Sequence, residues 1–273
     1  MSVEKTIAYN GFMTFWSLTD GTNSEVLRDA LNSINKASLL PSTQDESQAL
    51  RRSIASHFPK RSYLIRELDE VCGFGVVEED RTMEQLEYQE VLRVIAMGDM
   101  VVAAPQEHPA IEHIKQEFLF QKKLITASAL GGMLVNACRQ LSGISLRPRG
   151  GLYWIPEESR ESWEAICDAV ESCGGNRVFE LRTTTDAKTV DAVCDLLVLQ
   201  VEKKLETLEE DLQEGNLQQT RAIESRRDQA QELDALLSTY EGILGRTLKE
   251  LRERSEEVEE AACTALLLAS VAV

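Results

Sequence analysis

The sequence has few of the residues that most enzyme and metal sites need. Its 273 residues include only three histidines, His57, His108 and His113. His113 and Glu117 lie one helical turn apart, but no second ligand pair shares their spacing, so we expect no metal site. The patterns G-x-x-x-x-G-K-[ST] and G-x-S-x-G, typical of nucleotide binding and of hydrolase nucleophiles, are absent. We therefore expect no cofactor and no catalytic residues.

The sequence also lacks paired cysteines. None of its six cysteines forms a C-x-x-C pair, and several fall in stretches with helical spacing. Buried thiols of a protein in the reducing cytoplasm explain this usage best. The N-terminal stretch has an early acid, Glu4, and no continuous apolar run, which is not the pattern of a signal peptide.

Long apolar runs are missing as well. The two longest candidates are residues 124–138, which contain Thr126, Ser128 and Asn136, and residues 261–273. Both are shorter than the roughly 20 residues that a helix needs to cross a bilayer. We therefore expect a soluble protein that does not span a membrane.

Positive charge is scarce. The chain has 29 Lys and Arg against 46 Asp and Glu, a formal net charge of −17. Residues 187–273 hold 10 of the basic and 19 of the acidic residues, so the excess is spread over the chain. Long-range attraction to nucleic acid or to an anionic membrane needs a concentrated positive face, and this composition leaves room only for a local one.

Residues 1–186 have mixed strand and helix patterns. Residues 11–18 predict a strand, and helices are expected after Ser24, as an N-cap, and over residues 43–57. Residues 61–80 and 87–104 predict two pairs of antiparallel strands. One helix of about 30 residues is expected after Pro109, and its small residues place it at the centre of the fold.

Residues 146–166, LRPRGGLYWIPEESRESWEAI, raise the question of a phosphate-binding loop. The glycines precede the expected strand at 151–155, whereas a phosphate loop lies between a strand and the following helix. Glu157 and Glu158 occupy the start of the expected helix at 157–173, where they would repel a phosphate. With a further strand at 177–183, this segment predicts a strand–helix–strand unit and an α+β domain.

Residues 187–273 show a sustained helical repeat. Apolar residues recur every three or four positions from Val190 to Leu212 and again from Ile223 to Ala262, with residues 214–216 as a turn. The predicted fold is thus an α+β domain over residues 1–186, with a mixed or antiparallel sheet on a long central helix, followed by an antiparallel helical hairpin. Arg226 and Arg227 are placed to set the hairpin's register through salt bridges.

The two hairpin helices differ in length. The first covers about 27 residues, or roughly 40 Å, and the second has room for nearly twice that. The excess must pack either on the same chain or on another subunit. Because the uncharged end of the chain favours burial, we predict a non-enzymatic protein that assembles, or binds a protein partner, through its last helix. The expected partner-binding residues are Leu244, Leu248, Leu251, Val258, Leu266, Leu267 and Leu268.

A second hypothesis concerns arginines next to aromatic residues. Such a face can stack bases and hold the phosphates of single-stranded nucleic acid. Pairing of the arginines with the abundant acids, and burial of the aromatic rings, is the alternative explanation. The candidate nucleic-acid-binding residues are Arg147, Arg149, Tyr153, Trp154, Arg177 and Arg182.

Overall fold

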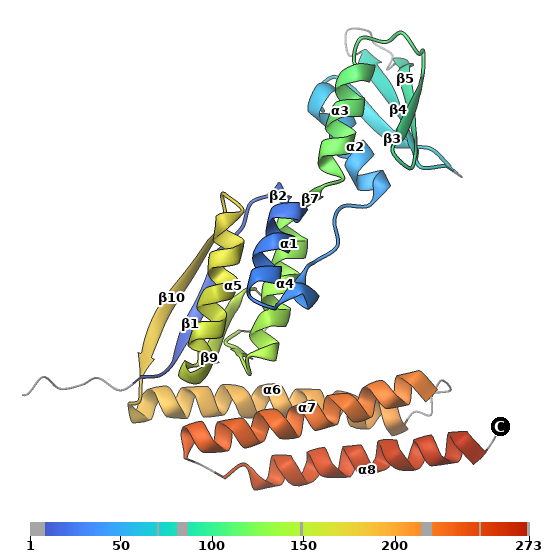
Figure 1. Ribbon diagram of the computed structural model, residues 1–273. Coiled ribbons are helices and arrows are strands. Elements are labelled where there is room, and N and C mark those ends of the chain that lie inside the picture. Colours follow the sequence, from blue (N-terminus) through green and yellow to red (C-terminus); the bar gives the residue numbers. More distant parts are fainter. Residues whose placement is uncertain are drawn as a thin grey trace, which may run out of the picture. The chain divides into compact units, whose positions relative to one another are not determined.

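The computed structural model describes residues 9–69, 71–80, 87–147, 150–213, 220–245 and 247–271 (Figure 1). The chain divides into two compact units. Unit 1 comprises Met1–Trp16, Val135–Ala165 and Val178–Val273, and unit 2 comprises Ser17–Leu134 and Ile166–Arg177. The fold is α+β, as the sequence predicts, and every strand pairing with a described register is antiparallel.

Unit 2 contains a four-stranded sheet in the order β3-β4-β5-β6, which confirms the two expected strand pairs. Helices α2 and α3 pack on one face of this sheet (Figure 1), and their apolar residues form one core with it, including Leu50, Phe74, Leu92 and Phe118. The bounds are α2 Glu46–His57, β3 Tyr63–Glu67, β4 Gly73–Asp80, β5 Glu87–Met97, β6 Met100–Ala104 and α3 Ile111–Gln121.

The helix expected to run for about 30 residues after Pro109 is two helices, so that prediction is wrong in its length. After α3 the chain forms a short strand, β7 (Leu124–Ile125), and then α4 (Ala127–Gln140). β7 pairs with β2 (Thr22–Asn23), which takes its backbone out of the helical hydrogen-bond pattern. The side chain of Thr126 then accepts a hydrogen bond from the Ala129 amide at 3.1 Å, which starts the second helix.

Unit 2 also contains α1 (Ser24–Ser33) and the short 3-10 helix η1 (Ala37–Leu39). The N-cap of α1 is Asn23 rather than the expected Ser24. Its side-chain oxygen accepts hydrogen bonds from the amides of Glu25 and Val26, so Ser24 is already the first helical residue.

Unit 1 contains a second four-stranded sheet, in the order β10-β1-β9-β8. Its strand β1 pairs with β9 in a register that places Met13 opposite Trp154. A Cβ at Gly11 would collide with the Trp154 ring and the backbone of Ile155, so only glycine fits there. The predicted order of strand, helix and strand is confirmed for β9, α5 and β10. The bounds are β1 Tyr9–Ser17, β8 Ile144–Ser145, β9 Leu152–Pro156, 3-10 helix η2 Glu157–Ser159, α5 Arg160–Ser172 and β10 Arg177–Thr184.

The C-terminal segment forms α6 (Ala187–Gln213), α7 (Thr220–Leu244) and α8 (Lys249–Val271), which lie side by side (Figure 1). We call these three helices the C-terminal bundle. The expected second helix of nearly double length is therefore wrong in its length, because it ends near Gly245, whose φ of 61° is left-handed. The expected turn at 214–216 lies outside the described residues.

Helices α7 and α8 run antiparallel. The Ser255 hydroxyl donates to the Ala230 carbonyl at 2.8 Å, and Arg252 pairs with Asp234, so partner numbers run in opposite directions along the two helices. The excess length thus packs on the same chain, which was one of the two alternatives. Expected register pairing is present for Arg226, which contacts Asp211 of α6 at 2.7 Å, whereas the described ion pair of Arg227 is with its neighbour Asp228.

The bundle packs against the sheet of unit 1 through a shared apolar core. Trp154 of β9 lies against Tyr240 of α7, with ring centroids 5.7 Å apart, and the Tyr240 hydroxyl donates to the Ser142 carbonyl at 2.9 Å. Burial raises the pKa of the Tyr240 hydroxyl well above its usual value. Within the described residues, no helix has the length and apolar character needed to cross a membrane.

Candidate functional site

The main concentration of positive charge lies where the first half of unit 2 passes from α2 to β3. Residues 47–66 contain no Asp or Glu, in a chain that has 46 of them. The basic residues of this stretch are Arg51, Arg52, Lys60, Arg61 and Arg66.

Local structure brings the two ends of this stretch together. Asp45 caps the start of α2 by accepting the Gln48 amide at 2.7 Å, and the helix ends before Phe58. Pro59 cannot donate a backbone hydrogen bond, and its carbonyl accepts the amides of Ser62 and Tyr63, which turns the chain back into β3. The last turns of α2 and the strand β3 therefore form the two walls of one groove.

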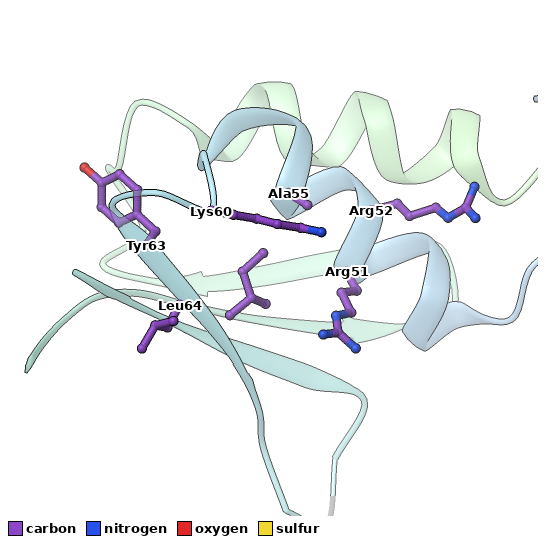
Figure 2. Close-up of a pocket in the computed structure, with 7 residues that line it drawn as sticks. Arg51, Arg52, Ala55, Lys60, Tyr63 and Leu64 are labelled. Atoms are coloured by element: carbon purple, nitrogen blue, oxygen red, sulfur yellow. The ribbon is translucent and has the colours of Figure 1, made fainter. Parts of the chain in front are cut away.

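Figure 2 shows this groove, which has a volume of about 560 Å³. Arg51, Arg52 and Lys60 extend from the α2 side, and the Lys60 side chain runs along the helix toward Arg51. Apolar atoms cover most of the lining. We call this site the basic groove, lined by Arg51, Arg52, Ala55, Lys60, Tyr63, Leu64 and Ile65.

Most of the positive charge at the basic groove is not balanced by nearby acids. Arg52 pairs with Asp20 at 3.2 Å, and this pair is itself about half exposed. In the part of the chain that the structure describes, Arg51 and Lys60 have no carboxylate within ion-pair distance. An anion that enters the groove thus meets two uncompensated cations and a third that is only partly neutralised.

The three histidines lie closer together than their spacing in the sequence indicates. The ring of His57 lies 5.6 Å from that of His113, and His108 contacts Phe58, which also contacts His57. Glu117, the expected metal partner of His113, accepts a hydrogen bond from Gln121 instead. Among the described residues, no group of three or more His, Cys, Asp and Glu side chains has a geometry that could hold a metal ion.

The C-terminal leucines predicted to bind a partner divide into two sets. Four of the predicted residues are buried inside the C-terminal bundle, with between 3% and 9% of each side chain exposed: Leu244, Leu248, Leu251 and Val258. They are core residues of the bundle as it stands. Leu266 is half-buried and Leu267 is 69% exposed, whereas the side chain of Leu268 lies outside the described residues.

The structure does not bring the predicted arginine and aromatic residues into one exposed face. Trp154 is buried and its indole donates to the Thr183 hydroxyl at 2.9 Å, while Tyr153 is buried beside it on β9. Arg182 pairs with Glu157, and Arg177 with Glu171. Arg147 is exposed, and Arg149 lies outside the described residues. A role of this set in nucleic-acid binding stays a prediction.

The sequence analysis missed the basic groove, although a signal for it exists. Residues 47–66 and the longer stretch 118–156 both lack Asp and Glu and hold five Lys or Arg each, and the basic residues are more closely spaced in 47–66. Sequence motifs of enzyme and nucleotide sites do not describe a groove between a helix and a strand edge.

Comparison with known proteins gives one match. No curated protein and no solved structure matches the chain. The sequence profile of a family of unknown function, DUF6744, matches residues 11–271, almost the full length. The chain therefore belongs to the DUF6744 family.

Proposed function

We propose that this chain is a non-enzymatic protein-interaction protein that binds acidic segments of a protein partner in the basic groove. The observation that carries the proposal is the groove itself, in which Arg51 and Lys60 have no described acid at ion-pair distance and lie beside an apolar lining. The cysteine usage and the absence of a described disulfide support a cytoplasmic setting.

The lining favours a peptide over a nucleic acid. The one aromatic residue of the groove, Tyr63, already packs edge-on against Phe58 at 5.0 Å between ring centroids, so its ring is engaged in the fold. Single-stranded nucleic acids bind through rows of stacking rings along a basic track. A net charge of −17 also repels a polyphosphate at long range, whereas a short peptide carries far less charge.

A fluorescently labelled acidic peptide, rich in glutamate and valine, tests this proposal by anisotropy. We expect saturable binding that weakens with added salt, and a loss of about tenfold or more in affinity for Lys60→Glu, because a cation becomes a repelling anion. Lys249→Glu is the matched control, since Lys249 is an exposed lysine of α8 that pairs with Glu253.

Two outcomes would overturn the proposal. One is equal binding by both variants, which would place the binding site elsewhere. The other is tighter binding of a single-stranded oligonucleotide than of the peptide, with the same Lys60 dependence, which would assign the groove to nucleic acid.

Assembly through the last helix is a second candidate, which the exposure of Leu267 near the end of α8 favours. Because Val258 and Ala262 are core residues of the bundle, truncating the chain within α8 would damage its fold. The test is sedimentation of the full chain and of Leu267→Glu. We expect an assembly that the variant dissociates, and a monomer for the unaltered chain would contradict this candidate.

A further inference from the structure

One wall of the basic groove is the edge of a β-sheet. β3 is the first strand in the order β3-β4-β5-β6, so it has a neighbouring strand on one side only. Edge strands carry a row of backbone N–H and C=O groups that are available to another strand.

The register shows which backbone groups face this free edge. The Leu68 amide donates to the Gly73 carbonyl at 3.0 Å, in line with the β3–β4 register that pairs Arg66 with Gly75. Hydrogen-bonded pairs alternate along antiparallel strands, so Leu64 and Arg66 bond to β4 while the N–H and C=O groups of Ile65 and Glu67 point away from it. The Tyr63 amide also points away from β4, as the Ile65 amide does, but it donates to the Pro59 carbonyl.

The side chains around this edge alternate in the same way. Ile65 packs toward the core under α2, whereas Leu64 and Arg66 lie on the opposite face of β3. A strand added at the edge would direct every second side chain toward α2, where Arg51 and Lys60 lie (Figure 2). Its other side chains would lie beside Leu64 and Arg66.

The β10 edge of the sheet in unit 1 does not offer this chemistry. β10 is also an edge strand, but its arginines, Arg177 and Arg182, pair with Glu171 and Glu157. Among the described residues, β3 is the strand edge that is combined with a groove and with cations that have no acidic neighbour.

We infer that the basic groove binds an extended acidic peptide as an additional strand on β3, with alternate acidic side chains directed at Arg51 and Lys60. This inference rests on the proposed function and specifies its ligand. Main-chain hydrogen bonds to Ile65 and Glu67 supply affinity that does not depend on sequence, and the cations select acidic side chains at every second position.

The test uses the full chain and a short synthetic peptide that alternates glutamate and valine. Two further versions carry N-methyl groups on one or the other set of alternate amides. Only one set of amides faces a neighbouring strand, so one version should lose about tenfold or more in affinity while the other binds within about twofold of the parent. Hydrogen exchange of the Ile65 and Glu67 amides should slow when the parent peptide is bound.

The outcomes separate this inference from the proposed function. If the parent peptide binds in a Lys60-dependent manner but the two methylated versions bind equally well, strand addition is wrong and the acidic-segment function stands. If no acidic peptide binds, both fail. Replacement of every glutamate by glutamine is the control for charge, and it should weaken binding by about tenfold or more whether or not the peptide forms a strand, because the cations then have no acidic side chain to bind.

Discussion

In the C-terminal bundle, arginine side chains join neighbouring helices, whereas two of the three cations that line the basic groove have no ion-pair partner among the described residues. Arg226 contacts Asp211, Arg252 contacts Asp234, and Arg254 contacts Glu209 through both of its carboxylate oxygens. Arg51 and Lys60, by contrast, have no such partner among the described residues. Residues 187–273 hold 19 acids, and residues 47–66 hold none.

This difference separates two roles for the same kind of side chain. A basic side chain that pairs with an acid on a neighbouring helix helps to fix how the two helices align, and its charge is already neutralised. A cation without an acid nearby costs nothing to leave in water and remains available to a ligand. If the basic groove binds a partner as proposed, substitutions in the bundle should change stability, and substitutions in the groove should change affinity.

The largest effect on stability should come from the bundle core. Leu237→Ala removes a fully buried side chain and should lower the free energy of unfolding by about 3 kcal/mol. All three tryptophans, Trp16, Trp154 and Trp163, belong to unit 1, so tryptophan fluorescence during urea unfolding reports on this unit. At low urea concentration, where the variant is folded, its affinity for the acidic peptide should not change. A large loss of affinity would contradict the prediction that the bundle and the basic groove act independently.

A smaller effect should come from the hydrogen bond that joins the bundle to the sheet. Tyr240→Phe removes the hydroxyl that donates to the Ser142 carbonyl and should cost about 1 kcal/mol in the free energy of unfolding. The same urea titration measures it. A cost as large as that of Leu237→Ala would mean that packing of the ring, and not the hydrogen bond alone, is disturbed.

The smallest effect should depend on pH. Asp186 precedes α6, and hydrogen bonds from Thr189 and Thr184 lower the pKa of its carboxyl group from 3.8 to about 2. A lowered carboxyl pKa stabilises the fold above pH 3.8, and this contribution is lost as the pH falls toward 2.

Asp186→Asn should therefore lower the thermal midpoint of unit 1 slightly at neutral pH. The difference from the unaltered chain should vanish near pH 2. A difference that is independent of pH would show that the charge of Asp186 has no part in capping α6.

Much of the fold could be predicted from the sequence, because the strands and the C-terminal helices have clear apolar periodicity. Two helix breaks were not predicted, and only one of them had a local signal. The end of the helix before β7 depends on pairing with β2, about 100 residues earlier in the chain. The break near Gly245 had a local signal, a glycine, within a repeat that otherwise continues through it.

The candidate site was less predictable for the same reason. The spacing of Leu248 and Val258 fits an apolar stripe that binds a partner as well as one that packs in the protein's own core. Only the packing of α8 on α7 shows that they are core residues. Whether an arginine is neutralised depends equally on neighbours that are distant in the sequence, as with Arg254 and Glu209. The acid-free window at 47–66 was visible, but its pairing with a strand edge required the fold.

The most direct test compares two double substitutions that remove the same charge. Arg51→Gln with Lys60→Gln neutralises two cations of the basic groove, and Arg252→Gln with Arg254→Gln neutralises two cations of the bundle. Binding of the acidic peptide and urea unfolding are measured for both. The account predicts that the groove pair loses affinity by about tenfold or more with unchanged stability, while the bundle pair loses stability with unchanged affinity. Equal losses of affinity in both would contradict it, because net charge and not the groove would then determine binding.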